Sequence, residues 1–323
     1  MENKKLVIAY NKIMPGAKAD ELDVLDEVKV VRQAAEKMGY QVSEVPVSLE
    51  VKQAMEQILE IAPKAIFNLV ESIENKGDLI FFAPAIFNTI KIPYTGAHLE
   101  SMFITSNKVL TKKELQRNSL PTADWFYPSD VHLINPSGQY ILKPLWEEGS
   151  LGLDEENVFF GNNQAMIEKV KRLRKEDYFI EEFIDGRELN ISMLAGPDGP
   201  EILPPAEMKF FDFPENKPRI VGYTAKWVED AFEYKHTART FEFAKEDSAM
   251  LSEVKNICLK CWEVFDLKGH VRVDLRLDKN NKPYILEINT NPCISPDSGF
   301  YAAAGKAGIS FEKVVERIIN DAY

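Results

Sequence analysis

The first hundred residues alternate short apolar runs with one long amphipathic run. The apolar run LVIAY at 6–10 is followed by Val24, Val28, Val31 and Ala35, whose spacing of three and four residues is typical of a helix. Two further apolar runs follow, QVSEVPV at 41–47 and AIFNLV at 65–70. Strands separated by helices indicate a βαβ unit with a parallel sheet, so we predict an N-terminal Rossmann-like α/β domain over residues 1–97.

The pattern changes after residue 97. A predicted helix containing Lys108 ends near Pro121, which cannot continue it. Strand candidates then follow one another through turns: QYILKPL at 139–145, YFIEEFI at 178–184 and ELNISML at 188–194. Strands joined in this way favour antiparallel pairing. We therefore expect an α+β arrangement beyond the first domain, with a central lobe over 98–184 and a C-terminal lobe over 185–323.

Composition narrows the class of protein. The chain has 323 residues, 45% of them hydrophobic, which is enough for a large core without disulfides. Its formal net charge of −12 disfavours binding to the phosphate backbone of nucleic acids. No apolar run approaches the roughly 20 residues that span a bilayer, so we expect a cytoplasmic protein that contacts no membrane.

The cysteines do not form a recognisable metal motif. Cys258 and Cys261 make a CxxC pair, but they share the helical spacing of the neighbouring Val254 and Ile257. Without a second Cys/His pair, we interpret them as helix core rather than as zinc ligands.

Two nucleotide-binding motifs are missing where an α/β domain often has one. The segment NKIMPGAKAD after the first strand is neither a GxGxxG fingerprint nor a GxxxxGK[ST] phosphate loop. A nicotinamide or P-loop nucleotide site is therefore not predicted there.

A strictly alternating segment near the C-terminus carries the strongest chemical signal. Over residues 270–278 every second residue is charged or ionisable and the others are apolar, which is the period of a strand. A turn leads to a second strand in which Glu287 and Asn289 share one face, and a hairpin would bring Asp274 to them. Oxygen ligands of this kind suit Mg²⁺. The alternative is the solvated outer face of a sheet.

Three lysines and one loop are candidates for binding phosphate. Lys108, Lys143 and Lys226 lie near these predicted elements, although a single lysine is usually a surface residue. The loop EEGSLG at 147–152 could close over phosphates through its backbone N–H groups and the Ser150 hydroxyl. On its own it is an acidic turn.

In their order along the chain, several segments resemble the D-alanyl-D-alanine ligases, which have the ATP-grasp fold. They are Lys143-Pro144 with EEGSLGL, IEEFIDGREL, YTAKW, RVDLRLD, ILEINTNP and the terminal SPDSGFYAAAGKAGISFEKVVERI. The resemblance implies a parallel N-terminal domain followed by two α+β lobes whose antiparallel sheets sandwich ATP.

The same resemblance implies roles for individual residues. Lys108 and Lys143 would contact the phosphates of ATP, and Glu188 its ribose. The linker that reads adenine would consist of Glu181, Glu182 and the backbone of Phe183 and Ile184. Two magnesium ions, for which Mn²⁺ could substitute, would be held by Asp274, Glu287 and Asn289. Arg272 would stabilise the oxyanion that forms on the substrate, while Ser150 and Lys226 would belong to loops that close on the nucleotide.

The residues expected to contact the amino-acid substrates depart from the family. Ser298 matches the serine of its second-substrate loop, but Cys293 replaces a glycine and Gly299 a bulky apolar residue. Val70 stands where the family has a histidine, and Glu21, or its neighbour Asp20, is the candidate to bind a substrate amine. We interpret Cys293 as structural rather than as a nucleophile, because no histidine lies near it in the sequence.

These features predict an ATP-dependent carboxylate–amine ligase that forms an acyl phosphate and releases ADP and phosphate. We expect an acid–amino acid ligase with small-molecule substrates that differ from D-alanine. The alternatives are a true D-alanine–D-alanine ligase of cell-wall synthesis and a non-catalytic ATP-binding partner protein. The apolar stretch FFAPAIF at 81–87 suggests a homodimer through the N-terminal domain, although a core helix explains it equally well.

Overall fold

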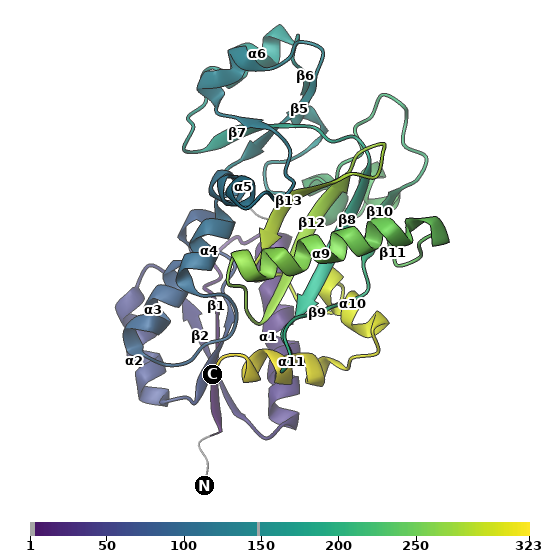
Figure 1. Ribbon diagram of the computed structural model, residues 1–323. Coiled ribbons are helices and arrows are strands. Elements are labelled where there is room, and N and C mark those ends of the chain that lie inside the picture. The colour runs from purple at the N-terminus through teal and green to yellow at the C-terminus, as the bar shows by residue number, and fades with distance from the viewer. Residues whose placement is uncertain (1–3, 147–148) are drawn as a thin grey trace.

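Three sheets organise the molecule (Figure 1). The computed structural model describes residues 4–146 and 149–323 and contains one parallel and two antiparallel sheets. This confirms the predicted fold class, a parallel α/β domain followed by two antiparallel α+β lobes. Among the described residues, none of the helices combines the length and apolarity that a membrane-spanning segment requires.

The N-terminal sheet is parallel, with strand order β2-β1-β3. Its strands are β1 (Lys5–Asn11), β2 (Gln41–Val47) and β3 (Ala65–Leu69). Helix α1 (Ala19–Lys37) covers one face, and α2 (Val51–Ile61) and α3 (Phe82–Ile90) cover the other. Because both faces are buried, the strands read as continuous apolar runs. The stretch at 81–87 enters α3, and most of it packs in this core.

The last two helices belong to the same core as the first. Helices α10 (Gly299–Lys306) and α11 (Phe311–Asn320) pack against α1 (Figure 1). The segment that joins β13 to α10 therefore runs beside α1. In this way the fold brings residues near 293 next to residues near 23.

The central sheet is antiparallel, with strand order β4-β7-β5-β6. Its strands are β4 (Trp125–Phe126), β5 (Gln139–Pro144), β6 (Val158–Phe160) and β7 (Tyr178–Glu182). The helical segments before and within this sheet are α4 (Leu99–Ser106), α5 (Lys108–Arg117), α6 (Gln164–Val170) and the 3-10 turns η2 (Pro128–Leu133) and η3 (Glu155–Asn157). A further 3-10 turn, η1 (Gly77–Leu79), lies between β3 and α3 in the N-terminal domain.

The third sheet has strand order β11-β10-β8-β12-β13, with β9 paired to β8. Its strands are β8 (Arg187–Leu194), β9 (Glu201–Ile202), β10 (Ala206–Phe210), β11 (Thr237–Thr240), β12 (His270–Leu277) and β13 (Pro283–Asn289). The helical segments are α7 (Tyr223–Trp227), α8 (Phe232–Lys235), η4 (Lys245–Asp247) and α9 (Ser248–Val264). Helix α9 covers the apolar face, where Cys258 and Cys261 are fully buried in the core, as their spacing predicts.

Candidate active site between the antiparallel sheets

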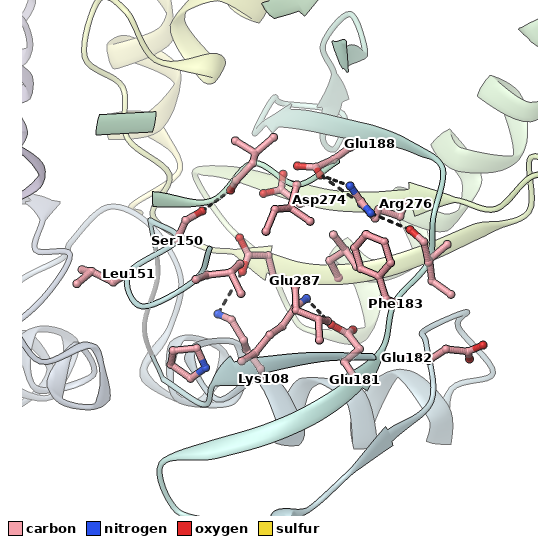
Figure 2. Close-up of a pocket in the computed structure, with 18 of the residues that line it drawn as sticks. Lys108, Ser150, Leu151, Glu181, Glu182, Phe183, Glu188, Asp274, Arg276 and Glu287 are labelled. Atoms are coloured by element: carbon pink, nitrogen blue, oxygen red, sulfur yellow. Dashed lines mark hydrogen bonds and ion pairs between the residues drawn. The ribbon is translucent and has the colours of Figure 1, made fainter. Parts of the chain in front are cut away.

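A cavity lies between the two antiparallel sheets (Figure 2). Its walls come from β5 and β7 of the central sheet and from β8, β12 and β13 of the third sheet. The lining includes most of the predicted nucleotide and metal residues: Lys108, Lys143, Ser150, Glu181, Glu182, Phe183, Ile184, Glu188, Lys226, Asp274 and Glu287.

The predicted hairpin supplies the acidic wall. Strands β12 and β13 pair antiparallel with Asp274 opposite Glu287 and Arg272 opposite Asn289. The side chain of Asp274 faces the cavity, and the residue is only 7% exposed. The polar face of the hairpin is therefore a covered wall of the site and not a solvated outer face.

Two neighbouring side chains fix the Asp274 carboxylate. Arg272 donates from Nε to Oδ1 and from Nη2 to Oδ2, both at 2.8 Å. Asn190 of β8 donates from Nδ2 to Oδ1, also at 2.8 Å. The sequence prediction missed Asn190, although Glu188 and Asn190 alternate with apolar residues in ELNISML as Arg272 and Asp274 do on β12.

A dense set of basic groups keeps Glu287 ionised. Lys108 Nζ lies 3.1 Å from Glu287 Oε2. Burial alone would raise the pKa of this carboxyl group, but the charges of Lys108, Lys226 and Arg272 hold it well below its usual value. An ionised carboxylate opposite Asp274 is the form that binds a divalent cation.

Glu181 lines the cavity and also forms ion pairs with two lysines. Its carboxylate pairs with Lys112 of α5 at 2.5 Å and with Lys143 of β5, and Glu181 and Lys112 are fully buried. Burial raises the pKa of Glu181, but both lysines outweigh it and the net shift is downward. Glu181 therefore orients Lys143, while the neighbouring Glu182 points away from the other labelled residues (Figure 2). Lys112 was not predicted as part of the site.

The end of the cavity near residues 183–188 is organised by Arg276. Its guanidinium donates to the carbonyl of Ile184 at 2.8 Å and to Glu188 Oε2 at 3.3 Å, and lies 4.9 Å from the ring of Phe183. It also donates to the carbonyl of Arg219. Arg276 thus fixes the predicted adenine linker and the predicted ribose ligand together. Sequence reasoning placed it on the polar face of the strand without giving it a role.

Two loops meet over the open side of the cavity. Ser150 Oγ donates to the carbonyl of Val221 at 2.7 Å, and Trp227 Nε1 donates to the carbonyl of Gly149 at 3.2 Å. Gly149 and Ser150 both have positive φ, 63° and 66°, so the loop turns sharply here. Residues 147 and 148 of the predicted phosphate loop lie outside the described residues.

Lys226 projects from α7 into the same cavity. Its pKa is lowered, first by desolvation and then by the charge of Arg272, whereas Glu287 and Asp274 partly oppose this shift. The lysine predicted from the YTAKW segment therefore lies among the acidic and basic groups of the hairpin.

The predicted substrate residues lie outside the lining of this cavity, in the segment after β13 and on α1. Ser298 caps α10, since its Oγ accepts from Tyr301 N at 3.2 Å. Cys293 Sγ lies 3.0 Å from Asp23 Oδ2, and burial together with nearby carboxylates raises the pKa of this thiol. A protonated thiol is a poor nucleophile, which supports a structural role. Glu21 lies in the first turn of α1.

Comparison with known proteins identifies relatives along most of the chain. Residues 139–320 match the family model described as D-ala D-ala ligase C-terminus. A D-alanine–D-alanine ligase from Pseudothermotoga lettingae is 30% identical over 299 residues, covering 90% of this chain and 92% of the relative. An uncharacterized protein, y4sG, from Sinorhizobium fredii is 29% identical over 264 residues, covering 80% of this chain and 74% of the relative.

Solved structures share the fold. The crystal structure of D-alanine–D-alanine ligase from Bacillus anthracis complexed with ATP superposes with a TM-score of 0.74 at 18% identity, covering 99% of this chain and 97% of that one. D-alanyl-alanine synthetase A from Vibrio cholerae gives a TM-score of 0.74 at 15% identity, covering 100% and 99%.

Proposed function

Because the chain belongs to the D-alanine–D-alanine ligase family and is an ATP-dependent ligase, we propose that it joins an amino-acid carboxylate to an amine through an acyl phosphate, on substrates other than two D-alanines. One observation carries this proposal. The cavity combines opposed carboxylates with several basic groups, while the segment at 293–299 has Cys293 and Gly299 where the sequence resemblance leads us to expect glycine and a bulky apolar residue.

The residues of the cavity fit ATP and magnesium. Asp274 and Glu287 in the cavity, with Asn289 beside them on β13, offer the oxygen ligands that Mg²⁺ prefers, and the ionised state of Glu287 suits a cation. Bound magnesium would offset the negative charge of the phosphates and so allow an anionic carboxylate to approach. Lys108 and Lys143 would turn from their carboxylate partners towards the phosphates, and the 183–188 segment held by Arg276 would bind the nucleoside.

In the first step an oxygen of the substrate carboxylate attacks the γ-phosphorus of ATP. The bond from that phosphorus to the β–γ bridging oxygen breaks, and ADP leaves with its electron pair. Lys108 and Lys143 hold the phosphate oxygens during this transfer. The product is an acyl phosphate bound beside Arg272.

In the second step the amine nitrogen attacks the acyl carbon. Arg272 donates hydrogen bonds to the oxygen on which negative charge develops. The bond between the acyl carbon and the phosphate oxygen breaks, and phosphate leaves with that electron pair and takes up the proton that the nitrogen loses. The loops joined by Ser150 and Trp227 exclude water, which would otherwise hydrolyse the acyl phosphate.

A true D-alanine–D-alanine ligase is the second candidate. It is favoured by the curated relatives that carry this name and by Ser298 at the start of α10. Formation of the dipeptide from D-alanine and ATP distinguishes it directly from the first proposal.

The test is phosphate release from ATP and Mg²⁺ with mixtures of amino acids, followed by mass analysis of the products. We expect amide formation, and we expect Asp274→Asn to lower the rate at least about 100-fold, since it weakens a metal ligand. Asp198→Asn, in an exposed turn, is the matched control. Absence of phosphate release with every acid and amine, or full activity of Asp274→Asn, would overturn the proposal.

A further inference from the structure

A second cluster of acidic groups lies outside the nucleotide cavity, where α1 meets the segment after β13. A carboxylate oxygen of Asp23, a carboxylate oxygen of Glu27 and the Sγ of Cys293 all lie within 4.8 Å of one another. We call these three residues the acidic cluster. In the sheet order β2-β1-β3 the central strand β1 has β2 on one side and β3 on the other, and the crevice at the carboxyl ends of such strands is where α/β folds bind ligands. Glu71, two residues beyond β3, contributes its charge to the cluster.

Glu27 supplies an independent reason to expect a ligand. The residue is 1% exposed, and its Oε2 accepts a hydrogen bond from the backbone N–H of Ile294 at 2.9 Å. Its Oε1 is buried and has no hydrogen-bond partner among the described residues. A buried oxygen of this kind is costly unless a donor meets it, and the cost is greatest for a carboxylate.

The charges around the acidic cluster favour a positively charged ligand. Burial first and then the charge of Glu71 raise the pKa of Glu27. The pKa of Asp23 is also raised by burial, and the charge of Asp297 adds to the shift. The charges acting on both carboxyl groups are thus negative, and a cation placed among them would relieve the repulsion.

The acidic residues are spread along one face of α1. Asp20, Asp23 and Glu27 are spaced three and four residues apart and so share one helix face, over about 10 Å of helix length. The outer end of this face meets α7, which bears Lys226, because Tyr223 Oη donates to Asp20 Oδ1 at 3.2 Å. The face therefore runs from the edge of the nucleotide site to the buried Glu27.

Basic groups lie near the segment that follows Cys293. Cys293 Sγ lies 3.0 Å from Ser295 Oγ, which donates to Asp297 Oδ1 at 2.7 Å. Arg239 of β11 donates to the carbonyl of Ser298 at 3.4 Å, and its pKa is lowered by burial and by the charge of Arg272. Two neighbouring guanidinium groups can hold a carboxylate. The site is thus basic towards the catalytic hairpin and acidic along α1.

We propose that this site binds an amino acid whose side chain ends in an ammonium or guanidinium group, as one of the two substrates of the ligation. The inference rests on the proposed function and names its substrate class. The substrate carboxylate lies towards Arg272 and Arg239, and the side-chain cation donates to Glu27 Oε1 and Asp23. A soft metal ion is the competing ligand for Asp23, Glu27 and Cys293. Its binding would have to displace the proton of the Cys293 thiol, whose pKa is raised by burial and by nearby carboxylates.

The direct test is calorimetric titration of the protein with lysine and with norleucine, which has nearly the same length but no side-chain charge, using both enantiomers of each. We expect lysine to bind at least about 10-fold more tightly, since hydrogen bonds to charged groups are worth more than 1.4 kcal/mol. Glu27→Gln should remove this preference while keeping the side-chain volume. Glu36→Gln, on the exposed part of the same helix, should retain it. If Glu27→Gln fails to fold in a thermal unfolding scan, the half-buried Asp23→Asn replaces it.

Equal affinity for lysine and norleucine would overturn the inference. So would zinc binding that is lost in Glu27→Gln while the preference for lysine stays unchanged. Phosphate release, measured in parallel, separates the two proposals. Turnover of neutral amino acids without a preference for lysine would support the ligase proposal and contradict the proposal of a basic substrate. Tight binding of lysine without phosphate release for any amine or acid would support the binding site and contradict the ligase proposal.

Discussion

At the scale of single residues, the site depends on how firmly Asp274 is held. Asn190 donates to the same carboxylate oxygen as Arg272 and thereby orients the predicted magnesium ligand. We expect Asn190→Ala to weaken the apparent affinity for Mg²⁺ about 10- to 100-fold, as loss of such a supporting partner usually does. The measurement is phosphate release as a function of Mg²⁺ concentration. Asn280→Ala, in the exposed turn of the hairpin, should behave as the wild type, and an unchanged Mg²⁺ dependence in Asn190→Ala would contradict the assignment.

The site residues that could be predicted lie in a clear local sequence pattern, and those that were missed do not all do so. Asp274 and Glu287 were predictable because residues 270–278 alternate strictly and Glu287 and Asn289 flank one apolar residue, which places both carboxylates on one face of a hairpin. Asn190 follows the same rule on β8 and could have been found. Glu27 could not, because a glutamate on an amphipathic helix is usually solvated, and its burial depends on a segment more than 260 residues further along the chain.

At the scale of elements, a buried ion triad joins α5, β5 and β7. Glu181 lies between Lys112 and Lys143, and both Glu181 and Lys112 are fully buried. We expect Glu181→Gln to destabilise the protein by about 3–5 kcal/mol, because it leaves a buried lysine without its counter-charge. The measurement is the free energy of unfolding from urea denaturation.

Glu182→Gln is the matched control for that experiment. It changes the next residue of the same strand in the same way, but its side chain is exposed, so we expect a change within about 0.5 kcal/mol. Similar stability of the two variants would show that the triad does not hold the three elements together.

The longer elements were predictable, and the short strands were not. The apolar runs of β1, β2 and β3 and the stripe of α1 have a clear period. By contrast, β4 contains two residues and exists because Trp125 and Phe126 pair with β7. A two-residue strand has no period of its own, so only its tertiary partner reveals it.

At the scale of the whole molecule, the two ends of the chain form one core. The amphipathic pattern predicts the last helix through Val314, Val315 and Ile318, but not that α11 packs on α1. That contact carries the segment from β13 to α10 past α1 and assembles the acidic cluster from both ends of the chain. Integrity of this core and binding at the cluster are therefore linked.

The same core contains a histidine that makes global stability depend on pH. His270 is fully buried at the start of β12, with its ring 5.4 Å from that of Phe300. Desolvation lowers its pKa from 6.5 to about 4, although the carbonyl of Pro292 partly opposes this shift. Between these two pKa values the unfolded chain binds the proton more strongly than the folded one. Stability is therefore fully present above the unfolded pKa and is lost as the pH falls.

We expect this single group to remove about 3 kcal/mol of unfolding free energy between pH 7 and pH 4. The measurement is urea denaturation across this range for the wild type and for His270→Phe, which keeps an aromatic ring beside Phe300. The buried carboxyl groups titrate in both proteins, so the difference between the two profiles isolates the histidine. The variant should lose less stability on acidification by about that amount. Parallel profiles would mean that the pKa of His270 is the same in the folded and unfolded protein. The protonated ring would then be stabilised inside the fold by a neighbouring acceptor.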